Sequence, residues 1–150
     1  MLAGRVNGPV YHVYRLRLEA LLHIPADADE QRIHEIIAAG FEPTRIKAWC
    51  EQSLFSTDAL NQDISMSTLH RRLARGQRLT LGESDRLFRL AHVAAMAEAV
   101  FENKEKALFW LCKPNLRFAG TPPIELLSTY LGTRLIEELL IEHADWLRCE

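Results

Sequence analysis

The spacing of apolar residues along the chain predicts helices almost throughout. From Tyr11 to Leu22, large apolar residues recur every three or four positions, which places them on one face of a helix. The same period recurs at 33–37, 46–54, 69–73, 87–101, 103–112 and 135–140. No segment alternates apolar and polar residues convincingly, and no internal repeat is visible. The pattern therefore predicts an all-α protein.

Residues that favour helix ends divide this pattern. Asp29 is placed to cap the helix that follows it, and Pro43 suits the first turn of the next one, where its missing N–H group has no helical partner. Thr80 and Glu83 have the spacing of a capping box, in which each side chain binds the backbone N–H group of the other residue. They open the longest apolar pattern of the chain. The alanines of that pattern predict close approach by a neighbouring helix.

The segment 65–78 is basic and contains no acidic residue. Its leucines share one face, and most of its arginines point to the opposite face. A short helix ending near Leu60, a corner at 60–65 and this helix give the order of a helix-turn-helix, whose second helix enters the major groove of DNA. The alternative is an ordinary core helix with a solvated basic face. The residues that would meet DNA are Ser67, Thr68, Arg71, Arg72 and Arg75.

Large apolar residues crowd a corner between two predicted helices, within the segment 105–127. Those in question are Phe109, Trp110, Leu111 and Phe118. One short helix can hardly turn all of them inward, so we expect part of this corner to be a surface for a partner. Thr121, Pro122 and Pro123 then begin a new helix. In the acidic tail, Trp146 is either folded back on the helices or inserted into a partner, because an isolated solvated tryptophan would waste its apolar area.

Composition limits the classes of protein that fit. Hydrophobic residues make up 48% of the chain, enough to bury a core, and the formal net charge is −2, so DNA binding requires a local basic patch. The cysteines are odd in number and far apart, which favours free thiols in a reducing cytoplasm. Arginines interrupt the apolar N-terminal segment, and no run of about 18 apolar residues occurs. We therefore expect a cytoplasmic protein that does not enter a membrane.

Motifs of catalysis and metal binding are not found in the sequence. The histidines lack HxxxH spacing, and neither a glycine-rich phosphate loop nor a GxSxG motif occurs. We expect no metal, no cofactor and no catalytic residue, and interpret the protein as a binder. The alternative is an enzyme that pairs Cys112 or Cys149 with a histidine.

Motifs in the second half of the chain follow one another in a distinctive order. They are Glu83-Ser84-Asp85-Arg86, Lys106-Ala107 with Trp110-Leu111, Pro114-Asn115, Thr121-Pro122 with Glu125-Leu126-Leu127, and Gly132. The order and spacing of these motifs strongly resemble those of the toxin-binding domain of the Xre/MbcA/ParS antitoxins. The resemblance covers roughly residues 80–142. The tail departs from the usual short segment of glycine and an aromatic residue, and reads His143-Ala144-Asp145-Trp146-Leu147 instead.

The resemblance implies a partner and a second activity. The partner would be a RES-domain toxin, a relative of ADP-ribosyltransferases that degrades NAD and is neutralised by direct binding. The Xre branch of the family carries a helix-turn-helix, which would lie at about 43–78 here and would repress the operon by binding operator DNA. In several members the C-terminus reaches the toxin's active-site cleft. Homodimers and higher-order toxin–antitoxin complexes are also implied.

These expectations combine into one architecture. An N-terminal helical region with the helix-turn-helix, residues 1–79, would pack on a C-terminal toxin-binding and dimerisation domain, residues 80–150. The candidate toxin contacts are Trp110, Asn115, Phe118, Asp145, Trp146 and Leu147. The alternative is a stand-alone dimeric DNA-binding regulator, whose C-terminal half would serve dimerisation.

Overall fold

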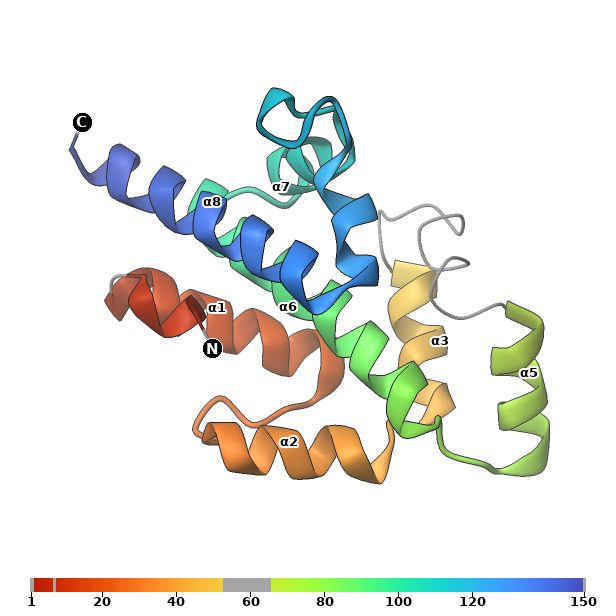
Figure 1. Cartoon of the computed structure of the whole chain (residues 1–150). Coiled ribbons are helices and arrows are strands. Elements are labelled where there is room, and N and C mark those ends of the chain that lie inside the picture. Colours follow the sequence, from red (N-terminus) through yellow and green to blue (C-terminus); the bar gives the residue numbers. More distant parts are fainter. Residues whose placement is uncertain (1, 7, 53–65, 150) are drawn as a thin grey trace.

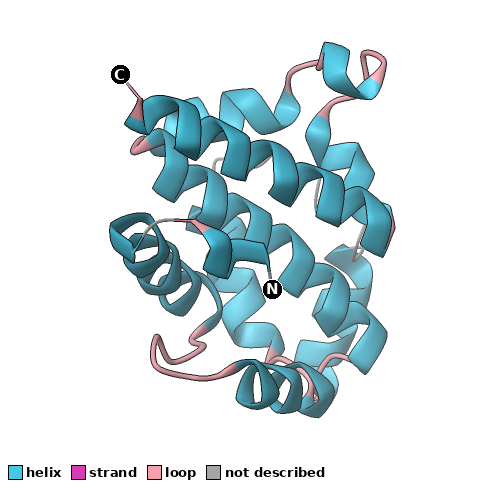
Figure 2. Ribbon diagram, turned by 60° about the vertical axis from the view of Figure 1, so that its left-hand side comes forward, coloured by secondary structure: helices cyan, strands magenta, loops and turns pink. Residues whose placement is uncertain are grey.

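The computed structural model describes residues 2–6, 8–52 and 66–149. Within these ranges every regular element is a helix, so the all-α prediction is confirmed (Figure 2). The α-helices are α1 (Gly8–Leu22), α2 (Glu30–Ala39), α3 (Pro43–Gln52), α5 (Met66–Arg75), α6 (Leu81–Phe101), α7 (Lys104–Cys112) and α8 (Tyr130–Arg148). Short 3₁₀ helices are η1 (Leu2–Arg5), η2 (Leu116–Phe118) and η3 (Pro123–Ser128). The expected helix ending near Leu60 and the corner at 60–65 lie outside the described residues.

Helix α6 is the centre of the fold. It runs through the middle of the molecule, and α1, α2, α7 and α8 pack around it (Figure 1). Almost every residue from Leu87 to Val100 is buried, as expected for a core helix with neighbours on all sides. Its alanines are buried too, so the predicted close approach of a neighbouring helix is confirmed.

The predicted helix starts are confirmed by their hydrogen bonds. The carboxylate of Asp29 accepts the N–H of Arg32 at 2.8 Å and caps α2. The hydroxyl of Thr80 accepts the N–H of Glu83 at 3.2 Å, and the Glu83 carboxylate accepts the N–H of Thr80 at 3.3 Å. The capping box thus fixes where α6 begins. Pro43 is the first residue of α3, as predicted.

The last helix begins earlier than the sequence suggested. Thr129 caps α8 by accepting the N–H of Gly132 at 2.9 Å, so Gly132 lies inside the first turn. A β-carbon at this glycine would lie 1.9 Å from the carbonyl oxygen of Leu126. Only a residue without a side chain allows η3 and α8 to meet this closely.

Leu135 lies outside the core, although the apolar period at 135–140 groups it with the other apolar residues of that segment. Ile136 and Leu140 are fully buried, whereas Leu135 is 48% exposed. The buried arc of α8 instead extends the other way around the helix, to Glu137 and Ala144. Leu135 therefore lies beyond the edge of this arc.

A buried polar chain joins α1, α6 and α8. The hydroxyl of Tyr14 lies 2.6 Å from Nδ1 of His92, and Nε2 of His92 lies 2.5 Å from a carboxylate oxygen of Glu137. Burial raises the pKa of Tyr14, so this hydroxyl keeps its proton. Because α1 precedes residue 79 and the other two helices follow it, one hydrophobic core crosses the boundary expected at 79/80.

Candidate nucleic-acid and toxin interfaces

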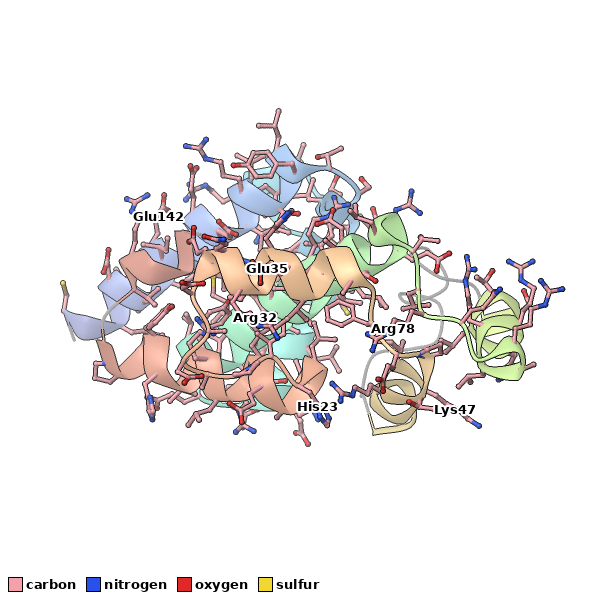
Figure 3. The ribbon with its side chains drawn as sticks, turned by 90° about the horizontal axis from the view of Figure 1, so that it is seen from below. His23, Arg32, Glu35, Lys47, Arg78 and Glu142 are labelled. Atoms are coloured by element: carbon pink, nitrogen blue, oxygen red, sulfur yellow. The ribbon has the colours of Figure 1, made fainter. Side chains whose placement is uncertain are left out.

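Helix α5 presents a basic face at the edge of the molecule. Leu69 is buried and holds α5 against the body, while Arg71 and Arg75 are exposed. Ser67 is exposed and Thr68 is half-buried. Nitrogen-tipped side chains gather around α5, which projects away from the rest of the chain (Figure 3). This arrangement places a local positive patch on a protein whose net charge is slightly negative.

Arg72 points in a different direction from the exposed arginines of α5. Its guanidinium donates to a carboxylate oxygen of Glu83 at 2.8 Å, and both side chains are only 19% exposed. Partial burial disfavours ionisation of Glu83, but the hydrogen bonds from Arg72 and Thr80 outweigh it and hold the pKa of Glu83 below its usual value. Arg72 therefore ties α5 to the capping box of α6.

The segment that follows α5 is tied to the connection between α2 and α3. Arg78 donates to the carbonyl oxygen of Gly40 at 2.9 Å and pairs with Glu42 at 3.3 Å (Figure 3). The N–H of Leu79 donates to the carbonyl oxygen of Phe41 at 3.0 Å. Gly40 has φ +85°, and a β-carbon there would lie 2.2 Å from the oxygen of Leu79. Polar contacts and one close backbone approach thus position α5.

A pocket of about 600 Å³ lies where α7, η2 and the end of α8 meet. Its lining consists of Trp110, Asn115, Arg117, Leu139, Glu142, His143 and Trp146. We call it the tryptophan pocket. The structure brings together here three of the six predicted toxin contacts, Trp110, Asn115 and Trp146.

Aromatic contacts hold the inner wall of the tryptophan pocket. The rings of Trp110 and His143 are nearly perpendicular, with centroids 5.9 Å apart, and Phe101 lies 5.7 Å from each of them. Trp146 lines the pocket but remains 62% exposed. Trp146 is therefore not folded back fully on the helices, and most of its indole surface remains available to a partner.

The other predicted toxin contacts lie outside the lining of this pocket. Phe118 is half-buried and packs against the core from η2. Asp145 is exposed, and Leu147 is 45% exposed, on the last turns of α8.

Sequence reasoning missed an exposed apolar stripe along α8. Leu131 is 68% exposed and, with Leu135 and Trp146, falls within about 60° around the helix at about 100° per residue. Glu142 lies on the same side. The sequence carries no local signal for this stripe, because the packing of α8 against α6 decides which side of the helix is buried. Between the start of α7 and the start of α8, Phe109, Leu116 and Tyr130 are also exposed.

A second pocket, of about 720 Å³, lies between α6 and α8. Arg89 pairs with Asp85 at 3.2 Å and also donates to the carbonyl oxygen of Leu127, while its buried Nε has no hydrogen-bond partner within the described residues. His92 and Glu137 bind each other.

Neither a metal centre nor a membrane span is present in the described part of the chain. Residues 2–6, 8–52 and 66–149 contain no group of three or more His, Cys, Asp or Glu side chains that could hold a metal ion. In the same ranges, no helix is both long enough and apolar enough to cross a bilayer.

Comparison with known proteins identifies the family. Residues 96–148 match the model of the antitoxin Xre/MbcA/ParS C-terminal toxin-binding domain. Antitoxin Xre of Pseudomonas putida strain KT2440 is 45% identical over 145 residues, which cover 97% of this chain and 91% of that relative. This chain belongs to the Xre family of antitoxins. The family resemblance in the sequence motifs is thereby confirmed.

Of the two candidate surfaces of this Xre-family antitoxin, one lies inside the segment that matches the family model and the other lies outside it. All residues that line the tryptophan pocket, and the apolar stripe of α8, fall within 96–148, the segment that matches a toxin-binding domain. The basic face of α5 lies outside that segment.

Proposed function

We propose that this Xre-family antitoxin neutralises a RES-domain, NAD-degrading toxin by direct binding through α7, η2 and α8. The observation that supports this most is the large exposed apolar surface in the segment that matches a toxin-binding domain, where Leu131, Leu135 and Trp146 form one stripe. Large exposed apolar patches on soluble domains mark sites of protein association. Aromatic residues such as Trp146 also contribute most to binding energy at such interfaces.

Co-expression with the protein encoded by the neighbouring gene tests this proposal. With a tag on one partner, we expect a stable complex to be purified and NAD loss in the cell to be suppressed. Leu131→Asp with Leu135→Asp should abolish the complex, because each change puts a charge into the apolar contact. Leu16→Asp is the matched control, because it puts the same charge on a leucine of α1 that is also 48% exposed and lies outside α7, η2 and α8. Failure to form a complex, with both proteins folded, would contradict the proposal.

We further propose that the antitoxin, as a homodimer or within a larger complex with the toxin, represses its own operon through a helix-turn-helix at about 43–78. The basic outer face of α5, with Arg71 and Arg75, supports this. One monomer offers few cations, so it should bind operator DNA weakly. A dimer would present two such helices to two half-sites. This activity would take place in the cytoplasm, where the operator lies.

The toxin complex separates this proposal from the stand-alone regulator, and operator binding tests the repression that both interpretations share. Both interpretations predict binding to the promoter region, with affinity that falls steeply with salt because each neutralised phosphate releases counterions. The stand-alone regulator predicts no toxin partner, so the purified complex would exclude it. Absence of promoter binding by both the free antitoxin and the complex would contradict the proposed repression.

A further inference from the structure

The tryptophan pocket combines indole surface with a carboxylate. Trp110 and Trp146 line it, and the carboxylate of Glu142 belongs to the same lining. Glu142 lies on α8, far from α5 (Figure 3). An aromatic wall next to a carboxylate is the environment that a cation with an extended face binds best.

The chain itself places a guanidinium at this pocket. Arg117, from η2, lines the pocket and pairs with Glu142 at 3.2 Å. The two side chains are 63% and 58% exposed. Exposed ion pairs contribute little to stability because water and salt screen them. The Arg117–Glu142 pair can therefore be exchanged for another at small cost.

We propose that the tryptophan pocket receives an arginine side chain of the toxin, which displaces Arg117 from Glu142. The inference rests on the proposed toxin binding. In the complex, the guanidinium stacks on indole surface and donates to the Glu142 carboxylate. Because a partner covers the pocket, this pair is shielded from water and becomes stronger than the exposed pair it replaces.

The chemistry of the pocket disfavours other side chains. A carboxylate from the partner could pair with Arg117, but it would face Glu142 and gain nothing from the indole faces, which attract cations. An apolar side chain would take the Arg117–Glu142 pair out of water without adding a hydrogen bond to it, and this desolvation is costly. A lysine ammonium is compact, and it lacks the planar face that lets a guanidinium stack on an indole while it pairs with a carboxylate.

The dissociation constant of the complex tests the inference. We would measure the binding of the neighbouring-gene toxin to the full-length antitoxin and to Glu142→Gln, Trp146→Leu and Arg117→Ala. Glu142→Gln and Trp146→Leu should each weaken binding about tenfold to a hundredfold. Arg117→Ala should tighten binding severalfold, because it removes the internal competitor. In the Glu142→Gln background, Arg117→Ala should have no effect.

A matched control separates a local pair from general charge attraction. Glu35→Gln removes the same charge from a similarly exposed ion pair, Arg32–Glu35 on α2, which lies outside α7, η2 and α8. Binding by this variant should stay near wild type. Replacing the toxin arginine that enters the pocket with glutamine should weaken binding to the wild-type antitoxin. The same toxin variant should bind the Glu142→Gln antitoxin as well as the unchanged toxin does.

The outcomes distinguish the inference from the proposed function. If the wild-type antitoxin binds the toxin and Glu142→Gln, folded with an unchanged Tm, binds equally well, the arginine pocket is wrong and toxin binding stands. Weaker binding by Arg117→Ala would also overturn it, because Arg117 would then be a contact and not a competitor. If the wild-type chain binds no toxin, the proposed function fails and the inference falls with it.

Discussion

Helices α5 and α8 both turn one face outward, but they expose different chemistry and are held in place differently. Helix α5 exposes arginines and is held by Leu69, by the Arg72–Glu83 pair and by the polar contacts after it. Helix α8 exposes leucines and a tryptophan, and a continuous buried arc fixes it to α6. A surface of charges attracts a polyanion over a distance and is sensitive to salt. An apolar surface needs close, well-positioned contact.

The difference in anchoring matches the difference in expected partners. Phosphates of DNA are repeated along a regular backbone. A helix that is held by a few polar contacts can therefore still bind them, because its position need not be precise. Contacts between apolar side chains depend on shape at the level of one methylene group. The better-anchored helix is the one we propose to bind a protein.

Two leucines of α8 provide the largest expected contrast. Leu140→Ala should lower the free energy of unfolding by about 2–5 kcal/mol, because it leaves a cavity beneath α8. Leu135→Ala should change it by less than about 0.5 kcal/mol, since Leu135 is 48% exposed, yet it should weaken toxin binding. Urea unfolding and toxin affinity check the pair. Equal losses of stability would mean that the exposed stripe belongs to the core.

Two glycines test how closely η3 and α8 must approach. Gly132→Ala should lower the free energy of unfolding by about 1–3 kcal/mol, because the new methyl group would meet the carbonyl oxygen of Leu126. Gly82→Ala, on α6, has no atom within 4 Å of the new methyl group and should stabilise by up to about 1 kcal/mol. Thermal unfolding of both variants gives the answer, and destabilisation by Gly82→Ala alone would reverse the argument.

The arginines of α5 should fall into two groups, according to how their replacement changes the salt dependence of operator binding. Replacing Arg71 and Arg75 with glutamine should weaken binding and reduce the slope of log K against log salt by about 0.9 for each phosphate that the protein no longer neutralises. Arg72→Gln should weaken binding through the position of α5, with the slope unchanged, because Arg72 is paired with Glu83. Titrations between low and moderate salt provide both quantities. A reduced slope for Arg72→Gln would mean that Arg72 binds a phosphate.

The buried Tyr14 hydroxyl should give the smallest effect, and one that depends on pH. Tyr14→Phe should cost about 1 kcal/mol near neutral pH, because the bond to His92 is lost. Burial raises the pKa of Tyr14 in the folded state above the unfolded value of about 10. The protonated hydroxyl therefore makes its full contribution to the free energy of unfolding below about pH 10, and this contribution is lost as the pH rises further.

The comparison of the wild-type protein with Tyr14→Phe isolates the pH-dependent contribution of this hydroxyl to stability. Above about pH 10, the free energy of unfolding of the wild-type protein should fall more steeply than that of Tyr14→Phe. Urea unfolding at several pH values between neutral and alkaline measures the difference. Parallel curves would show that the hydroxyl does not need its proton in the folded state.

The sequence was informative wherever a structure depends on neighbouring residues. The capping box at Thr80 and Glu83, the Asp29 cap and the start of α3 at Pro43 depend on residues within one turn, and each was predicted correctly. The apolar period also gave α6 as the longest apolar pattern, whose alanines predicted the close approach of a neighbouring helix. Three of the predicted toxin contacts lie together in one pocket, although their role remains a prediction.

The register of α8 and the partner of Arg72 depended on residues distant in the sequence. Leu135 has the same chemistry as Leu140, and only the packing of α8 against α6 decides which of them is buried. Likewise, Arg72 looks like its neighbours in the basic segment until Glu83 is brought against it, 11 residues away.

By itself, the sequence determined the helical class, the family and the positions of most helix ends, because these follow from short-range spacing and from motifs in a fixed order. The tertiary structure decided which apolar side chains face solvent, which arginines are free to meet a partner, and that Arg117 and Glu142 meet across 25 residues at the tryptophan pocket. The physical reason is that burial and ion pairing depend on which helices lie side by side in space.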